Sequence, residues 1–230
     1  MIRHISFPLE EDKEVSLLRV GDIVYLNGTV FTMRDSAHQL LFSNADRGLT
    51  PPMNLKGAAV WHCGPVVRRD RDNWEVTSVG STTSYRFTGV TPRLLEEFQV
   101  KAVIGKGGLG PEAIAALQRT GSVFLATVGG CAGVYAQNVR RVIAVHWAEM
   151  GLPEAVWELE VENLGALIVA IDASGDNLYG KTMEQVGRRL ADIYVDLNIH
   201  PDYRYVYWPP SLPGVPQVAD CFKNYNPGEE

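Results

Sequence analysis

The sequence has little cysteine: only Cys63, Cys131 and Cys221 occur in 230 residues. Their number is odd and they lie far apart, so we expect no disulfide framework and predict a reducing, cytoplasmic location. The spacing of the three residues matches no local motif for an iron–sulfur cluster. We therefore predict that this chain holds no metal site of its own.

The sequence also lacks long hydrophobic runs and an excess of positive charge. No stretch approaches the roughly 18 consecutive apolar residues of a membrane helix, and the N-terminal residues 1–4 lack the apolar core of a signal peptide. The net charge is −6, which disfavours a general nucleic-acid surface. We expect neither a membrane nor a nucleic acid as partner.

What the chain does have is enough apolar sequence, 46% of 230 residues, for one large or two small domains. Strands alternate with helices, which favours an α/β fold with a layered mixed sheet. Asn27-Gly28 predicts either a strand pair or one bulged strand over residues 23–32. The other predicted strands cover residues 58–63, 74–79, 103–104, 122–126, 139–147, 156–161 and 167–171; helices are predicted over 34–43, from Thr91-Pro92 through Phe98, over 111–120 and over 130–138.

The character of the sequence changes at about Gly180. Residues 181–197 have amphipathic helical spacing, and a tail rich in Pro, Tyr and Trp follows, including residues 203–210. We therefore predict one domain over residues 1–180 and a C-terminal helix with an aromatic and proline-rich extension over residues 181–230. Such a tail is expected to wrap its own domain or a neighbouring chain.

Arg34 and His38 are the first candidate site residues, because they follow a strand and are four residues apart at the start of a helix. A guanidinium is a planar fork that binds a carboxylate through two hydrogen bonds. The alternative is structural: an Arg34–Asp35 surface pair, with His38 packing its helix.

The segment from Gly80 to Arg86 is the second candidate, because several hydroxyls in a row after a glycine are typical of a loop. If that loop is extended, Thr82, Ser84 and Arg86 point to the same side. An ordinary Ser/Thr turn is the alternative. The charged residues 68–73 predict another turn, between two strands.

Lys106 is the third candidate, because Gly105, Gly107 and Gly108 flank it. Glycines let the backbone approach a ligand closely and present N–H groups to an anion. The segment lacks the Lys-Ser/Thr pattern of a nucleotide-binding P-loop, and an exposed loop is the alternative. His62, His146 and His200 are not spaced as a metal site, and we assign none of them to catalysis.

Five motifs, taken together, resemble one known family. In order they are Arg34-Asp35-x-Ala37-His38, His62-x-Gly64-Pro65, Gly80-x-Thr82-Thr83-Ser84-x-Arg86, Gly105-Lys106-Gly107-Gly108 and Leu152-Pro153-Glu154-Ala155-x-Trp157. Over roughly residues 15–180 the chain resembles the β subunit, or C-terminal domain, of the iron–sulfur hydro-lyases: L(+)-tartrate dehydratase and class I fumarate hydratase.

The resemblance implies a swivelling β/β/α domain and a hetero-oligomer with an α subunit that carries a [4Fe-4S] cluster on its own cysteines. It implies a hydro-lyase whose substrate is a small 2-hydroxy dicarboxylate: tartrate, malate or fumarate, or a methylated relative. By similarity, Arg34, Arg86 and Lys106 would bind the substrate carboxylates. Thr82 is the family's candidate for moving the C–H proton, and His38 matches a position proposed as catalytic.

The chemistry agrees with this assignment, because removing a proton next to a carboxylate builds negative charge that fixed cations stabilise. An alcohol such as Thr82 is far too weak an acid to ionise unaided, whereas an unperturbed histidine, the residue type of His38, has a pKa near 6.5. Two rivals stay open: a non-catalytic subunit or anion-binding module that keeps the fold, and an enzyme that uses the same cations without iron.

Overall fold

The computed structural model describes residues 1–10, 13–71 and 73–200. The chain divides into two compact units, residues 1–179 and residues 180–230, and each is described by itself. The aromatic and proline-rich stretch 203–210 lies outside the described residues. The extension boundary that we placed at residue 180 stays a prediction.

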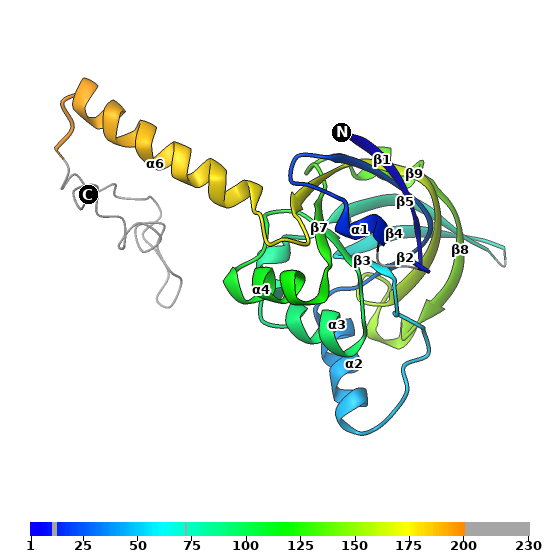
Figure 1. Cartoon of the computed structure of the whole chain (residues 1–230). Coiled ribbons are helices and arrows are strands. Elements are labelled where there is room, and N and C mark those ends of the chain that lie inside the picture. The colour runs from blue at the N-terminus through cyan, green and yellow to red at the C-terminus, as the bar shows by residue number, and fades with distance from the viewer. Residues whose placement is uncertain (11–12, 72, 201–230) are drawn as a thin grey trace. The chain divides into compact units, whose positions relative to one another are not determined.

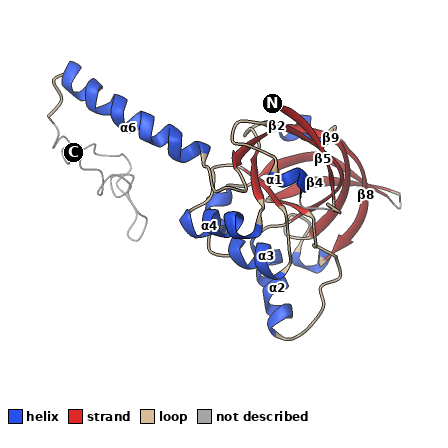
Figure 2. Cartoon of the chain, in the orientation of Figure 1, coloured by secondary structure: helices blue, strands red, loops and turns tan. Residues whose placement is uncertain are grey.

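Most strands of the first unit belong to one sheet in the order β1-β2-β3-β6-β7-β9-β8. Strand β9 also pairs with β2, so the ring β2-β3-β6-β7-β9 closes on itself, and Figure 2 shows the strands curving around a common centre. The described strands are β1 (Ile2–Phe7), β2 (Ile23–Thr32), β3 (Ala59–Trp61), β4 (Cys63–Asp70), β5 (Asn73–Ser81), β6 (Ala102–Gly105), β7 (Val123–Ala126), β8 (Val139–His146) and β9 (Val156–Ile171).

The helices alternate with the strands along the chain. They are α1 (Lys13–Ser16), α2 (Asp35–Asp46), α3 (Thr91–Glu97), α4 (Pro111–Thr120), α5 (Ala132–Ala136) and α6 (Leu178–Asp196), with short 3-10 helices η1 (Ser84–Phe87) and η2 (Ala148–Met150). Helices α2, α3 and α4 gather on one side of the strands (Figure 1). Proline at the first turn and glycine after the last residue bound α4, where Gly121 has φ +64°.

The alternation of side chains along the short central strands produces the layers. On β3, Ala59 and Trp61 belong to the core cluster inside the curved sheet, whereas Val60 belongs to the cluster under the helices. Strand β7 does the same, with Leu125 inside and Phe124 toward the helices. Because successive side chains point to opposite faces, these fully apolar strands are buried on both sides. The predicted α/β class with a layered mixed sheet is confirmed.

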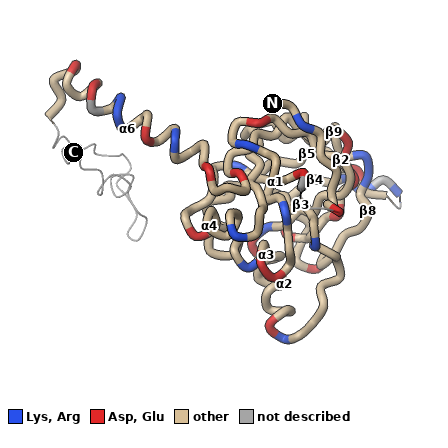
Figure 3. The backbone as a smooth tube through the Cα atoms, in the orientation of Figure 1, with Lys and Arg blue, Asp and Glu red and all other residues tan. Residues whose placement is uncertain are grey.

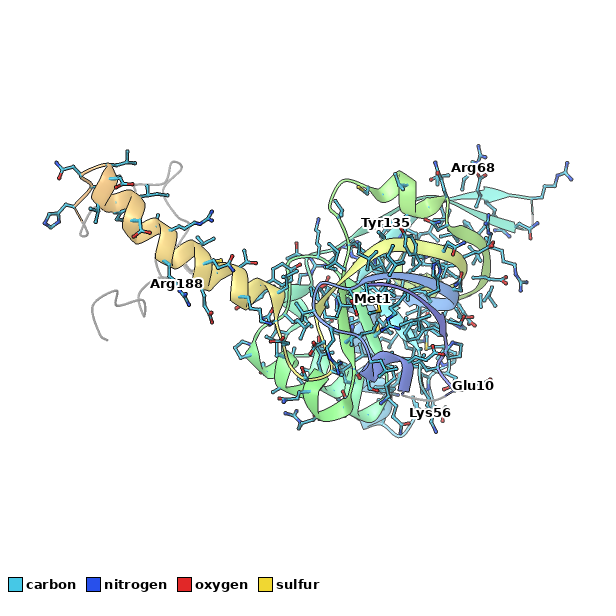
Figure 4. The ribbon with its side chains drawn as sticks, turned by 45° about the horizontal axis from the view of Figure 1, so that its top comes forward. Met1, Glu10, Lys56, Arg68, Tyr135 and Arg188 are labelled. Carbon is cyan, nitrogen blue, oxygen red and sulfur yellow. The ribbon has the colours of Figure 1, made fainter. Side chains whose placement is uncertain are left out.

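Two predicted elements differ from the structure. The predicted turn over residues 68–73 is mostly strand: β4 and β5 form a two-stranded hairpin that carries the exposed Arg68–Glu75 ion pair (Figure 4, where Arg68 is labelled). The two predicted strands 156–161 and 167–171 are the single strand β9, because both halves pair with β2. Strand β2 is one bulged strand, with register shifts on either side of Leu26.

Helix α6 exposes apolar side chains, among them Met183, Ile193 and Val195. Within the described residues, no helix is long and apolar enough to cross a membrane. Acidic and basic residues are interspersed along the backbone tube (Figure 3).

Candidate anion-binding and catalytic site

Three of the five motif segments follow neighbouring parallel strands at their carboxyl ends. Arg34 follows β2, His62 follows β3 and Lys106 follows β6, and β2-β3-β6 are adjacent and parallel. Backbone hydrogen bonds continue the pairing past the strand ends, from Met33 N to the Trp61 carbonyl at 2.9 Å and from His62 N to the Ile104 carbonyl at 2.8 Å. In open α/β sheets and in closed α/β barrels alike, ligand sites form at the carboxyl ends of parallel strands.

The Thr82 segment reaches the same edge from the β4–β5 hairpin. The backbone N–H of Thr82 donates to the His62 carbonyl at 2.7 Å, and that of Ser84 donates to the Lys106 carbonyl at 2.7 Å. Thr83 and Lys106 form an isolated parallel bridge. Thr82 and Lys106, which are 24 positions apart in the sequence, therefore belong to adjoining backbone segments.

We predicted that Thr82, Ser84 and Arg86 would point to the same side if their loop were extended. The loop is not extended over its whole length. Residues Ser84 to Phe87 form the 3-10 helix η1, and Ser84 is fully buried while Arg86 is exposed. Ser84 therefore does not share the solvent side with Arg86, and the Thr82 side chain is half-buried.

Arg34 lies against the backbone of Gly64. A β-carbon at Gly64 would stand 2.9 Å from Arg34 Cδ and 2.4 Å from the Pro153 carbonyl oxygen, so only glycine fits there. The Glu154 carboxylate lies 3.3 Å from Arg34 Nε and also accepts a hydrogen bond from the backbone N–H of Ser36 at 2.9 Å. Glu154 thus holds Arg34 and satisfies one free N–H in the first turn of α2.

Arg86 is paired with Asp35, the neighbour of Arg34. Its Nη2 lies 2.5 Å from Asp35 Oδ2, and its guanidinium carbon lies 4.8 Å from the centre of the Phe87 ring. The Arg34–Asp35 pair of our structural alternative is replaced by two pairs, Arg34–Glu154 and Asp35–Arg86. Arg34 and Arg86 are therefore anchored through consecutive residues at the start of α2.

Behind these cations lies a buried pair of histidines. The rings of His38 and His62 have centres 5.4 Å apart, and both pack on Phe87, at 5.1 Å and 4.4 Å. His38 Nδ1 lies 2.8 Å from the Arg34 carbonyl oxygen. Because a carbonyl only accepts, that nitrogen carries the proton, and Nε2 keeps its lone pair. Among the residues that the structure describes, neither Nε2 has a hydrogen-bond partner, although both are buried.

Burial sets the charge state of these groups. It lowers the pKa of His38 to about 4, and the Arg34 carbonyl, Asp35 and Glu154 only partly oppose this shift. Burial, with His38 and Arg86 nearby, holds the pKa of His62 well below its usual value. Burial also raises the pKa of the Cys63 thiol well above its usual value, with Arg34 opposing. At neutral pH all three groups are therefore uncharged.

The Lys106 loop contains two left-handed glycines, Gly107 at φ +79° and Gly108 at φ +72°. The Tyr179 ring covers Gly108, where a β-carbon would stand 2.9 Å from Cδ2. Burial raises the pKa of Tyr179, while hydrogen bonds from the backbone of Gly107 and Gly108 oppose the shift. The Lys106 side chain itself is half-buried.

The structure thus brings the segments of Arg34, His38, Thr82, Arg86 and Lys106 to one edge of the sheet. Sequence reasoning missed Glu154 and Tyr179 as contacts of this site. It named Ser84 in the Thr82 loop and His62 in a family motif, but assigned His62 no part in the site. The Leu152-Pro153-Glu154 motif was a signal for Glu154. Nothing local marked Tyr179.

A surface groove lies at the other end of the sheet. Residues 50–56 and 97–99 line it, and these precede β3 and β6. It contains Lys56 and Glu97 as its charged residues, so it lacks the paired cations that an anionic substrate requires. We place the candidate site at the carboxyl edge instead.

The residues that the structure describes do not form a cluster site. Within the described ranges, no group of three His, Cys, Asp or Glu side chains could hold a metal ion. Cys63 is buried as a neutral thiol, whereas the cysteines that bind an iron–sulfur cluster do so as thiolates. We therefore derive no step through a cluster bound to this part of the chain.

Comparison with known proteins decides the family. The family model described as the fumarase C-terminus matches residues 2–182. This chain belongs to that family. The match covers every candidate residue of the site, from Arg34 to Tyr179.

Several relatives carry names from the same family. A protein of Methanocaldococcus jannaschii, "Putative L(+)-tartrate dehydratase subunit beta", is 40% identical over 79% of this chain and 93% of its own length. The Escherichia coli "L(+)-tartrate dehydratase subunit beta" is 38% identical over 88% of this chain and 99% of its own length. A "Putative fumarate hydratase class I" of Geobacillus stearothermophilus is 38% identical over 76% of this chain, which spans 33% of that relative.

Proposed function

We propose that this chain is the β component of an iron–sulfur hydro-lyase that reversibly dehydrates a small 2-hydroxy dicarboxylate. The candidate substrates are tartrate, malate or fumarate, and a methylated relative. The family match over residues 2–182 and the relatives' names support the hydro-lyase class and the β role. The observation that carries the site is the pairing of Arg86 with Asp35, next to Arg34, at the edge that also holds Lys106.

In this proposal the three cations bind the substrate carboxylates. Arg34 and Arg86 present planar forks, and Lys106 presents an ammonium beside glycine backbone. Each charge-assisted hydrogen bond contributes about 1.5–3 kcal/mol. The anion would compete with Asp35 for Arg86, which is the more exposed of the two arginines.

Thr82 and His38 are the proposed proton-handling residues. The Thr82 side chain is half-buried, and its segment adjoins the Lys106 backbone, so Lys106 is the proposed cation that stabilises an ionised hydroxyl. His38 is buried, and only its Nε2 lone pair is free to accept a proton. Exposure therefore favours Thr82 as the group that meets the substrate.

The cluster and the α partner are part of the same proposal. The relatives' names include the word subunit, which supports a partner chain and a hetero-oligomer. The [4Fe-4S] cluster would be held by that partner, and when bound it would supply Lewis-acid chemistry to the leaving hydroxyl. This chain would bind the substrate carboxylates and transfer the proton. A cytoplasmic location is part of the proposal.

Anaerobic reconstitution tests the proposal. This chain, mixed with its α partner and iron and sulfide, is expected to dehydrate at least one of tartrate, malate and a methylated malate. A fully loaded complex that is inactive on all three would overturn the proposal in favour of a non-catalytic anion-binding subunit. Activity that survives removal of iron would favour an enzyme that uses these cations without iron.

A further inference from the structure

We propose that His62 is a positioning residue that fixes the Thr82 and Lys106 loops relative to each other through a buried bond to Ser84. This inference rests on the proposed function for its catalytic readout, but not for its structural one. Sequence reasoning assigned His62 no role, and the relatives' names assign no residue.

His62 is tied to both loops by its own atoms. Its carbonyl accepts the backbone N–H of Thr82 at 2.7 Å, and its Nδ1 lies 3.0 Å from Ser84 Oγ in a fully buried contact. Ser84 in turn donates its backbone N–H to the Lys106 carbonyl at 2.7 Å. His62 therefore contacts the Thr82 loop through its backbone carbonyl and, through its imidazole and Ser84, the Lys106 loop.

The space around this bond leaves no room for a side chain at Gly105. A β-carbon at Gly105 would stand 1.8 Å from Ser84 Oγ and 3.6 Å from His62 Cβ. Glycine is thus required beneath the serine hydroxyl, which lies where a side chain of β6 would otherwise be. Both Ser84 and His62 are completely buried, so water does not compete for the hydroxyl.

The remaining contacts keep the imidazole in place. Its ring packs on Phe87 at 4.4 Å and on His38 at 5.4 Å between ring centres. Phe87 also lies under the Arg86 guanidinium. Within the described part of the chain, the His62 Nε2 is buried without a partner, and the only side-chain hydrogen bond that orients the ring is the one to Ser84. Losing that bond would leave two buried polar groups unpaired.

The position of His62 has a kinetic consequence. A displaced Thr82 slows proton transfer and lowers kcat, whereas a displaced Lys106 weakens carboxylate binding and raises KM. Misplacement of catalytic groups by about 1 Å costs about 100-fold in rate. Loss of the His62–Ser84 bond should therefore change both constants.

The test uses the reconstituted complex with three variants. His62→Leu and Ser84→Ala should each lower kcat/KM by about 100-fold, with kcat lower and KM higher. Because they remove the same bond, the double variant should be no worse than the poorer single one. His62→Asn, whose amide can reach Ser84 from the place of Nδ1, should recover most of the loss.

Two controls separate positioning from folding. Leu117→Ala removes a buried side chain of α4 and should lower the melting temperature while kcat/KM at a temperature well below it stays unchanged. His4→Leu makes the same substitution at an exposed histidine of β1 and should change neither. Additive losses in the double variant, or a loss of melting temperature without a change in kcat and KM, would overturn the inference.

A spectroscopic experiment tests the bond between His62 and Ser84 without a measurement of turnover. In the full chain labelled with ¹⁵N-histidine, Ser84→Ala should shift the ring nitrogen resonances of His62 and leave those of His4 in place. An inactive wild-type complex would refute the proposed function, while unshifted His62 resonances would refute the bond itself.

Discussion

The Arg86 guanidinium lies 2.5 Å from the Asp35 carboxylate, 51 positions away in the sequence. Asp35 is the first residue of α2 and the direct neighbour of Arg34. This ion pair joins η1 to the start of α2, so two of the three proposed carboxylate ligands are anchored at one point. Three of the predictions below follow from that junction and the residues packed against it.

Arg86→Ala should abolish most turnover with little loss of stability. Its ion pair with Asp35 is exposed, with side-chain exposures of 44% and 47%, and exposed pairs contribute about 0–1 kcal/mol to folding. Losing charge-assisted bonds to a substrate carboxylate should lower kcat/KM by about 10- to 100-fold. Steady-state kinetics and a melting curve check both parts. Arg68→Ala, at an exposed ion pair of the hairpin, is the matched control; a large melting-temperature loss confined to Arg86→Ala would favour a structural role.

Glu154→Gln should raise KM. The neutral amide keeps the shape of the side chain but loses the charge that holds Arg34 at 3.3 Å and faces the start of α2. We expect stability to fall by about 0.5–1 kcal/mol and KM to rise several-fold. Initial rates of the reconstituted complex at increasing concentrations of a dicarboxylate measure the change in KM. Glu75→Gln, at the Arg68 pair, should leave KM unchanged; equal effects of the two variants would contradict the role of Glu154.

Gly64→Ala should impair binding more than a similar change elsewhere. The new methyl group would stand 2.4 Å from the Pro153 carbonyl oxygen and 2.9 Å from Arg34 Cδ, so Arg34 and the segment that carries Glu154 must move. Overpacking of this kind costs about 1–3 kcal/mol. Gly133→Ala is the control, because its β-carbon would meet open space. Wild-type KM and stability in Gly64→Ala would show that Arg34 does not depend on this contact.

Stability should fall as the pH drops from about 6.5 to about 4, the range between the unfolded and folded pKa values of His38. In this pH range His38 binds a proton in the unfolded chain but not in the folded chain. Above this range the full stability is present. For His38 the loss is about 2 kcal/mol at about pH 5, and His62 acts in the same direction.

Urea unfolding of wild type and His38→Leu at about pH 7.5 and about pH 5 isolates this contribution from that of the carboxylates. The variant should lose less stability than wild type between the two pH values. Identical losses would show that His38 is protonated in the folded chain.

Cys63 should resist alkylation in the native protein, while Cys131 should react faster. Cys63 is fully buried and its thiol pKa is raised, and the thiolate is the reactive form. Cys131 is only half-buried. Iodoacetamide labelling followed by peptide mass spectrometry measures both rates, and denaturant should equalise them. Rapid native labelling of Cys63 would show that the edge around Arg34 opens readily.

Local signals were sufficient for most elements of the fold. Pro111 and Gly121 bound α4, and Asn27-Gly28 marks the bulge of β2, because these residues restrict or permit backbone conformations without help from the rest of the chain. The length of β9 was not predictable, since its two apolar halves are joined only by their common pairing with β2. The N-terminal strand β1 likewise depends on its partner β2.

The candidate cations could be named from motifs, but not their partners. Arg34 has Asp35 as its neighbour in sequence, yet it pairs with Glu154, and Asp35 pairs with Arg86. Ion pairs depend on which strand ends become adjacent, and that is decided by long-range sheet pairing. The burial of His38, and hence its lowered pKa, is decided in the same way.

By itself, the sequence determined the alternation of strands and helices, the glycines that leave room for close contacts, and the family to which the motifs point. Those properties reside in single residues and short spacings. Only the tertiary structure decided that the segments carrying Arg34, Thr82 and Lys106 adjoin at one edge, and that His62 and Ser84 meet above Gly105. Hydrogen bonds between residues far apart in the chain form only once the parallel strands have paired.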